Sequence, residues 1–439
     1  MYCLRDTTMA LPTAFHEPHE YFEECLKLFE EYQHLYIFPN TDLIVKQVLE
    51  NICVQGLEHV DVFDESFDLS KNICNDYLRN FFLKTRRLKI RYSEFQEQNL
   101  QFFIDAPLSL KKKHEITYLS EEIDVVCKMT GCETVVDFGA GLGYLDQQIF
   151  KTSNFKVLGL ECNENNYVNA KKRQRKYHFD SLENVKYIKH TITEHSNNEI
   201  LKFIRDKFHS EQFCICGLHA CADLTVDAIN LFLKMEHARA IVIMPCCYHK
   251  ISQNDDGMFK NFPLSNCLKH TYKSYIAHIN IPFLRLAAQP PNKSDVKMED
   301  LVFSLLARAT LQKYAYEHNI ILRRKKRKAV RFKTKQRDFN TYVKDAVESG
   351  FSFIFNGESE RNTPDLDELS LVWQQHSLIT FKKAAIFIVL QNNLQQIFEN
   401  FILYDRLLYL KENGITNCEF KRIVNEKLSP RCFALIAKK

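Results

Sequence analysis

The chain has 439 residues, a length at which one hydrophobic core usually gives way to two or more structural regions. Hydrophobic residues make up 45% and charged residues 26% of it, a composition that excludes a fibrous or wholly disordered protein. The net charge of +4 hides one basic segment, from Arg323 to Arg337, which carries ten Lys or Arg residues and no acid. The remainder of the chain is therefore net acidic.

Export and membrane signals are not apparent in the sequence. The opening residues lack a basic stretch followed by an apolar one, and no apolar run approaches the roughly 18 residues of a membrane span. The 15 cysteines are odd in number and scattered, which favours reduced thiols over a disulfide framework. We expect an intracellular protein of the cytoplasm or nucleus with no membrane partner, and its oligomeric state stays open.

The first part of the chain has a helical pattern. Apolar residues recur at helical spacing from Glu17 to Tyr36 and again from Asp42 to Gln55, which predicts two helices. No catalytic motif is found there. We therefore interpret residues 1–110 as a helical region for packing or for a lid.

From about Lys111 short apolar strands alternate with amphipathic helices, which is typical of a parallel sheet with helices on both faces. Strands are predicted at residues 134–138, 156–161, 184–190, 213–218 and 240–244, and helices at 142–152 and 165–177. Residues 111–248 thus form the first part of a sheet domain.

The alternation then breaks down over residues 249–383, which we interpret as an insertion that contains the basic segment. A helix is predicted at 392–412, and strands at 418–424 and 431–437 flank Ser429-Pro430 as a hairpin. Residues 384–439 would complete the sheet. The predicted class is α/β, a Rossmann-like sheet with a terminal antiparallel hairpin, a helical N-terminal region and a large insertion.

A glycine-rich turn follows the first predicted strand. Residues 135–143 place Gly139, Gly141 and Gly143 between that strand and a helix. Glycines let the main chain approach a ligand closely, and the start of a helix offers free N–H groups. A tight turn without a ligand is the alternative, because such a turn alone is weak support.

Two acids and one tyrosine favour a particular ligand. Asp137 ends the first strand, and Glu161 ends the second, where a carboxylate can accept both ribose hydroxyls. The dinucleotide fingerprint requires a glycine at position 144, but the residue there is Tyr144. The pattern therefore favours S-adenosylmethionine over a nicotinamide dinucleotide.

Several short motifs, taken together and in this order, resemble the methyltransferase-like protein 25 family. They are the glycine turn, Lys-Lys-His-Glu at 112–115, Gly-Leu-His-Ala-Cys-Ala-Asp-Leu at 217–224, Cys-Cys-Tyr-His at 246–249 and Leu-Ser-Pro-Arg at 428–431. The histidine and cysteine segments are also loosely similar to a group of tRNA 2′-O-methyltransferases. The resemblance to the methyltransferase-like protein 25 family spans most of residues 111–244 and the C-terminal quarter.

The resemblance implies a class I methyltransferase fold with S-adenosylmethionine between the first and second strands. It adds Lys113 and His114 to the expected cofactor-binding residues. The sequence departs from better-known methyltransferases at 189–191, where Lys-His-Thr replaces the acid often found near the adenine.

Candidate catalytic residues follow the fourth and fifth strands, whose carboxyl ends meet at the edge of the sheet near the cofactor. We expect His219 or Asp223 to accept a proton from the nucleophile, and Tyr248 or His249 to shape the target pocket. The alternative is that these loop residues only form local hydrogen bonds.

A metal site is a further possibility that the sequence does not favour. Thiolate and imidazole suit zinc, and seven residues could converge: Cys214, Cys216, His219, Cys221, Cys246, Cys247 and His249. No paired C-x-x-C motif is present, and methyl transfer from a sulfonium needs no metal. We therefore predict none.

The basic segments favour RNA as the partner. The segment from Arg323 to Arg337 could neutralise several phosphates, and a second basic surface runs from Lys171 to Lys176. A solvated loop or a nuclear import signal would explain the first segment equally well. The sequence thus predicts an S-adenosylmethionine-dependent methyltransferase that acts on RNA, with a protein or small-molecule methyltransferase, or a catalytically silent cofactor-binding module, as alternatives.

Overall fold

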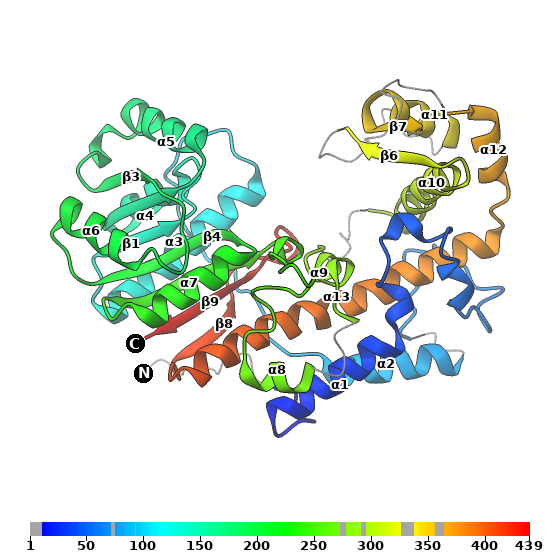
Figure 1. The fold of residues 1–439 in the computed structure, drawn as a ribbon, viewed down its shortest axis with the longest axis horizontal. Coiled ribbons are helices and arrows are strands. Elements are labelled where there is room, and N and C mark those ends of the chain that lie inside the picture. The colour runs from blue at the N-terminus through cyan, green and yellow to red at the C-terminus, as the bar shows by residue number, and fades with distance from the viewer. Residues whose placement is uncertain are drawn as a thin grey trace.

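The computed structural model describes residues 11–71, 75–92, 94–272, 278–290, 296–325, 338–355 and 364–439. A sheet domain lies at one end of the long axis and a smaller unit at the other, with a layer of helices between them (Figure 1). Helix α13 (Leu378–Glu412) runs from the smaller unit to the sheet. Among the helices of the described ranges, none combines the length and the apolar character that crossing a membrane requires.

The main sheet has seven strands in the order β3-β2-β1-β4-β5-β9-β8. β1 to β5 are parallel, and β9 runs antiparallel to both β5 and β8. The strands are β1 (Thr134–Phe138), β2 (Lys156–Glu161), β3 (Val185–Lys189), β4 (Phe213–Cys221), β5 (Ala238–Cys246), β8 (Cys418–Arg422) and β9 (Phe433–Lys438). The predicted class I methyltransferase sheet, with its terminal antiparallel hairpin, is confirmed.

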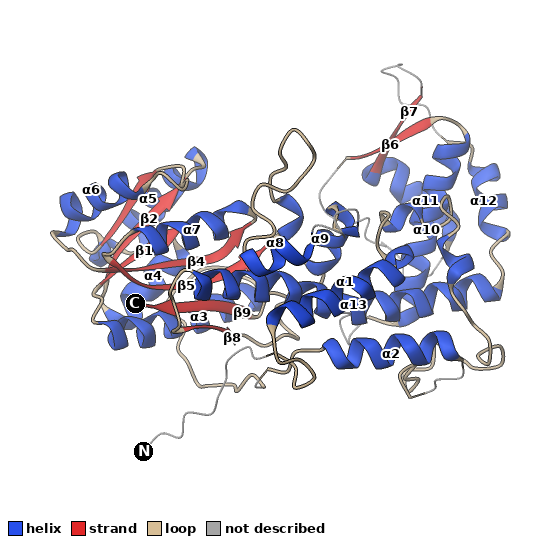
Figure 2. Ribbon diagram, turned by 60° about the horizontal axis from the view of Figure 1, so that its bottom comes forward, coloured by secondary structure: helices blue, strands red, loops and turns tan. Residues whose placement is uncertain are grey.

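Helices cover both faces of this sheet (Figure 2). They are α3 (Leu110–Thr130), α4 (Tyr144–Ser153), α5 (Glu164–Tyr177), α6 (Asn197–Phe208) and α7 (Asp223–Lys234). All five residues of β1 are buried, because this central strand is covered on both faces. The glycine turn and the loops after β4 and β5 therefore emerge at one edge of a rigid core.

The N-terminal region is only partly as predicted. α1 (Pro18–Glu31) and α2 (Asp76–Leu88) are helices, but the helix predicted over residues 42–55 is wrong. Gln47 adopts a left-handed φ of 51°, which breaks the helical path, and only short 3-10 turns form at Asn40–Asp42 and Val48–Asn51. The apolar residues of this segment are nevertheless largely buried, so their pattern indicated burial rather than a helix.

The segment between β5 and α13 splits between two cores. α8 (Asn266–Tyr272) and α9 (Ile281–Ala287) pack on the main core. A second core joins α10 (Met298–Glu317), β6 (Ile320–Arg324), α11 (Phe339–Asp345), β7 (Phe351–Phe355) and α12 (Leu366–Gln374). In this core Trp373 stacks on Phe339 with ring centroids 4.5 Å apart. The division of the chain into four regions, taken from the sequence, stays a prediction.

Candidate functional site

The glycine turn after β1 has a backbone that side chains would not tolerate. Gly139, Gly141 and Gly143 have φ values of 90°, 60° and 75°. A Cβ atom at Gly143 would also run into the phenol ring of Tyr187. The turn therefore brings bare main chain to the carboxyl edge of β1 and β2, which is what close approach of a ligand requires.

Glu161, at the end of β2, braces this turn. Its Oε2 accepts the Gly141 N–H at 2.8 Å, and its Oε1 accepts the Asn163 N–H at 2.7 Å. The side chain is only 7% exposed. A carboxylate fixed between the glycine turn and the end of β2 is suited to accept the two hydroxyls of a ribose.

A second buried acid, Asp146 of α4, lies next to Asp137. Asp137 Oδ1 and both carboxyl oxygens of Asp146 have no hydrogen-bond partner among the described residues. Burial raises the pKa of Asp137 to about 7, and the charge of Glu161 adds to the rise. Burial, with the neighbouring Asp137, raises the pKa of Asp146 as well. Burial thus disfavours negative charge on this pair, and Asp137 keeps an orphaned oxygen beneath the turn.

Residues of α3 border the turn, though not those that the resemblance indicated. Lys112 Nζ lies 5.0 Å from the centre of the Tyr144 ring, and Arg173 lies 4.4 Å from the same ring. Lys113 instead lies over Phe102, at 5.6 Å.

His114 is engaged elsewhere, because its Nε2 accepts the Asn425 N–H at 3.0 Å in the loop between β8 and β9. His114 thus holds this loop, and Lys112 rather than Lys113 contacts Tyr144 at the turn. The cofactor-binding roles expected of Lys113 and His114 stay a prediction.

His219 is oriented by a buried carboxylate. Its Nε2 lies 3.1 Å from Oε2 of Glu115, and Ser429 donates its hydroxyl to the other oxygen of Glu115 at 2.5 Å. Burial alone would raise the pKa of Glu115, but the bonds from His219 and Ser429 hold it below its ordinary value. The His219 side chain is 33% exposed at the carboxyl end of β4, so the imidazole can reach a bound molecule.

The other two catalytic candidates form local hydrogen bonds. Both oxygens of Asp223 are occupied: Oδ2 accepts the N–H and hydroxyl of Ser252, and Oδ1 accepts the Asn261 amide at 2.7 Å. Tyr248 is fully buried, and its hydroxyl donates to Oε1 of Glu399 at 3.1 Å. Asp223 thus fixes the loop after β5, Tyr248 packs beneath it, and their catalytic roles stay a prediction.

Three of the seven candidate metal ligands come together. The sulfur atoms of Cys221, Cys246 and Cys247 all lie within 4.8 Å of one another, and those of Cys221 and Cys246 are 3.0 Å apart. Cys214 and Cys216 are buried within β4, and His219 faces Glu115. The loops after β4 and β5 therefore carry a thiol cluster that the sequence did not favour.

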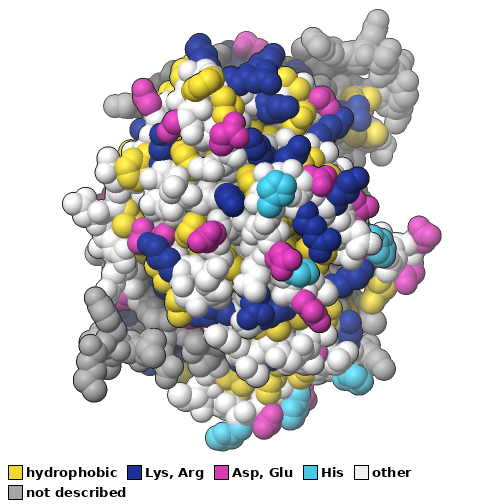
Figure 3. Space-filling model, turned by 90° about the vertical axis from the view of Figure 1, so that its left-hand side faces the viewer, with side chains coloured by type: hydrophobic (Ala, Val, Ile, Leu, Met, Phe, Trp, Pro, Cys, Tyr) yellow, Lys and Arg dark blue, Asp and Glu magenta, His cyan; other side chains and the backbone are white. Residues whose placement is uncertain are grey.

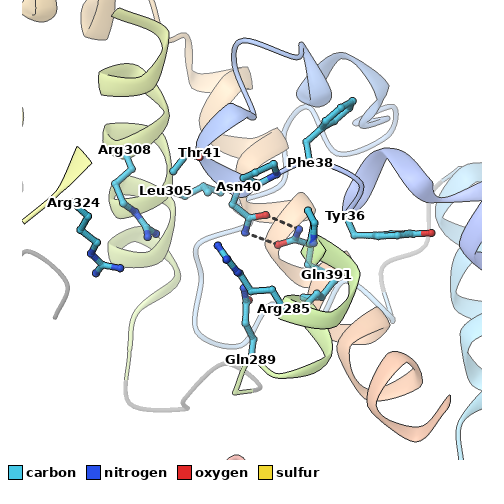
Figure 4. Close-up of a pocket in the computed structure, with 13 residues that line it drawn as sticks. Tyr36, Phe38, Asn40, Thr41, Arg285, Gln289, Leu305, Arg308, Arg324 and Gln391 are labelled. Atoms are coloured by element: carbon cyan, nitrogen blue, oxygen red, sulfur yellow. Dashed lines mark hydrogen bonds between the residues drawn. The ribbon is translucent and has the colours of Figure 1, made fainter. Parts of the chain in front are cut away.

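An arginine-lined pocket of about 430 Å³ lies between the N-terminal region and the segments that carry α9, α10 and β6. Figure 4 shows Arg285, Arg308 and Arg324 directed toward the same hollow, beside two reciprocal 2.9 Å hydrogen bonds between Asn40 and Gln391. No acid is among its described lining residues. This arginine pocket is suited to an anion.

The predicted basic surfaces are partly visible. On α5, Lys172, Arg175 and Lys176 are exposed, and Figure 3 shows Lys and Arg side chains spread over the sheet-domain end of the molecule among scattered acids. Of the segment from Arg323 to Arg337, residues 323–325 are described and exposed. Residues 326–337 lie outside the described part of the chain.

Comparison with known proteins agrees with this geometry. Residues 111–254 match a family model described as a methyltransferase domain. Two curated relatives are named Probable methyltransferase-like protein 25: the Mus musculus protein is 23% identical over 238 residues and the Homo sapiens protein 24% identical over 300 residues. The alignments cover 52% and 66% of this chain but 38% and 46% of those relatives. The chain thus spans less than half the length of either.

Solved methyltransferases show low overall similarity. The plantazolicin methyltransferase BamL, in complex with a triazolic desmethylPZN analog and SAH, is 14% identical, with 61% of this chain and 80% of that chain covered and a TM-score of 0.22. The methyltransferase domain of bacterial CtHen1-C is 12% identical, with 36% and 85% covered and a TM-score of 0.23. The fold assignment rests on the order and direction of the strands and on the domain match. Residues 111–254, with the terminal strands β8 and β9, therefore form a class I methyltransferase fold, and the chain resembles methyltransferase-like protein 25.

Proposed function

We propose that the protein is an S-adenosylmethionine-dependent methyltransferase. The observation that carries this is the Glu161 carboxylate held on the Gly141 N–H, at the edge where the bare glycine turn leaves β1. The cofactor supplies an already activated methyl group. The chain's own residues need chiefly to bind it, align the acceptor and exclude water.

His219 is the candidate group for moving a proton. It lies at the carboxyl end of β4, next to β1, and the buried Glu115 fixes its ring. A histidine oriented in this way can accept the proton of a hydroxyl or amine as the acceptor attacks the methyl group. Because Asp223 and Tyr248 form other hydrogen bonds, His219 is the preferred general base among the three catalytic candidates.

We propose RNA as the substrate class. The exposed cations of α5 and the arginine pocket, together with residues 323–325, support a polyanionic partner. Sequence-independent affinity for nucleic acid comes mainly from such contacts with phosphates.

Titration calorimetry with S-adenosylmethionine tests the cofactor. Glu161→Gln should weaken binding at least about tenfold, because it removes charge-assisted hydrogen bonds to the ribose. Glu183→Gln, whose side chain is 94% exposed, is the matched control and should bind like the wild type. Folded wild-type protein that does not bind, or equal affinity in both variants, would overturn the proposal.

Incubation with radiolabelled S-adenosylmethionine and fractionated cell extract tests the substrate. Label in RNA supports the proposal, and label in protein or small molecules selects the alternative methyltransferases. Cofactor binding without any label transfer identifies a silent module.

The double variant Arg285→Ala, Arg308→Ala should lower RNA affinity about tenfold and flatten its salt dependence. Arg205→Ala, an exposed arginine of α6, provides the control. If the double variant kept its affinity for RNA, the arginine pocket would not be part of the RNA-binding surface.

A further inference from the structure

The parallel pairing of β4 and β5 brings the thiol cluster together. Cys221 and Cys246 are the last residues of these strands and lie opposite each other in the ladder, so their side chains project from the same end of the sheet. Cys247 follows with a left-handed φ of 52°, and this turn of the backbone places its sulfur atom within reach of the other two. Three thiols therefore meet where two loops leave the sheet.

The separations of the sulfur atoms are suited to a metal ion. Zn–S bonds of about 2.3 Å in a tetrahedral arrangement place sulfur atoms about 3.8 Å apart. The three sulfur atoms lie within 4.8 Å of one another, and the 3.0 Å separation of Cys221 and Cys246 would widen on binding. A disulfide would instead require that pair to approach to about 2.05 Å and would leave Cys247 unused.

Two of the three thiols are accessible to solvent. A metal ion binds the thiolate form of cysteine, so binding would release the thiol protons to solvent. Cys221 and Cys247 are partly exposed, so an ion can enter from solvent, while Cys246 is buried beneath them.

We propose that Cys221, Cys246 and Cys247 form a zinc site with one open coordination position. Within the described residues, no His, Asp, Glu or further Cys joins the three sulfur atoms at that distance. Sites with three protein ligands keep their fourth position for an exchangeable ligand such as water. The open position would lie at the same edge of the sheet as the glycine turn, since β4 is the neighbour of β1.

The test uses the full chain purified without chelator, with metal content measured by plasma mass spectrometry. We expect about one zinc per chain, and an intense sulfur-to-metal charge-transfer band after replacement by Co²⁺. Added imidazole should shift the Co²⁺ spectrum by occupying the open position. Cys221→Ser and Cys247→Ser should each weaken binding at least about tenfold, whereas Cys267→Ser, on α8, should not.

Thiol alkylation of the wild-type protein keeps the proposal falsifiable if the variants fail to fold. Zinc should slow the reaction of Cys221 and Cys247 with iodoacetamide and leave that of Cys267 unchanged. Three results would overturn the zinc site. They are a native Cys221–Cys246 disulfide in the mass spectrum, a folded protein that binds neither metal, and equal zinc content in the cluster and control variants. A Co²⁺ spectrum that imidazole does not shift would overturn the open position.

Discussion

Asp137 and Asp146 make the stability of the fold depend on pH. The pKa of Asp137 is about 7 in the folded protein, well above the value of about 3.9 in an unfolded chain. Between roughly pH 4 and pH 7 the folded state therefore binds more protons than the unfolded state. The contribution of this pair to the free energy of unfolding is largest at low pH and is lost as the pH rises through that window.

Asp146→Asn should remove much of this dependence. The amide carries no charge and can donate to the orphaned oxygen of Asp137, so we expect a gain of roughly 1–3 kcal/mol at pH 8 and little change at pH 4. Urea unfolding at the two pH values measures it. Asp206→Asn, at an exposed position of α6, should follow the wild type, and an equal pH slope in both variants would contradict the assignment.

Glu115→Gln tests the orientation of His219. The amide cannot provide the charged acceptor that holds the ring, so kcat should fall roughly tenfold to a hundredfold, the range of a misplaced general base. Affinity for S-adenosylmethionine should stay unchanged, because Glu115 does not touch the glycine turn. Methyl transfer at saturating cofactor, together with calorimetry, separates the two quantities, and parallel loss of both would indicate a merely structural role.

Individual residues of the site differ in how far the sequence could reveal them. The glycines and Glu161 follow from one local rule, an apolar strand that runs into a glycine turn and a helix. Asp146 and Glu115 do not, because an acid in the first turns of a helix normally stabilises that helix at the surface. Their burial depends on Tyr187, Ser429 and other residues far away in the chain.

At the scale of elements, α13 ties the sheet to the helical layer through buried charges. Glu399 of this helix accepts from Tyr248, Gln395 and Arg431, and Arg431 also donates to the carbonyls of Ala287 and Gln289. The loops after β5, α9 and β8 thus meet on one helix. A single carboxylate satisfies donors from three separate segments.

Substitutions of Glu399 and of Tyr248 should lower the free energy of unfolding by different amounts. Glu399→Gln leaves the Arg431 guanidinium buried without its counter-charge and should cost about 3–5 kcal/mol. Tyr248→Phe removes one hydrogen bond to a charged group and should cost about 1–3 kcal/mol. Chemical denaturation measures both. Methyl transfer per folded molecule should persist in Tyr248→Phe, and its loss in a stable variant would restore the catalytic role.

Elements were predictable where short apolar segments alternate with amphipathic ones or flank a turn. The strands and the terminal hairpin met that condition. α13 did not meet this condition, because its long buried surface hides the helical period. The helix begins at Leu378 rather than at the predicted residue 392. Residues 42–55 had the period, but the left-handed Gln47 depends on the packing of neighbouring segments.

At the scale of the whole molecule, the sheet is closed by the end of the chain. β9 pairs with β5 through Ala240 to Ile243 and with β8 on its other side. Local patterns predicted the hairpin but not its place beside β5, since pairings so distant in sequence leave no local signal.

Removal of residues 433–439 should make the protein insoluble. The truncation exposes the hydrogen-bonding edge of β5 and uncovers the apolar face that Leu435 and Ala437 help to fill. Expression and sedimentation measure the outcome. Alanine substitution of the exposed Lys411 provides a nearby control, and a soluble, monomeric truncated protein would contradict the prediction.

The position of β9 in the chain also determines how long β5 lacks its partner strand during synthesis. After Cys246 ends β5, the ribosome must add nearly two hundred residues before Phe433 begins β9. At about 5–20 residues per second this takes roughly 10–40 s, during which the edge of β5 has no partner. We expect the nascent chain to depend on chaperones throughout this interval.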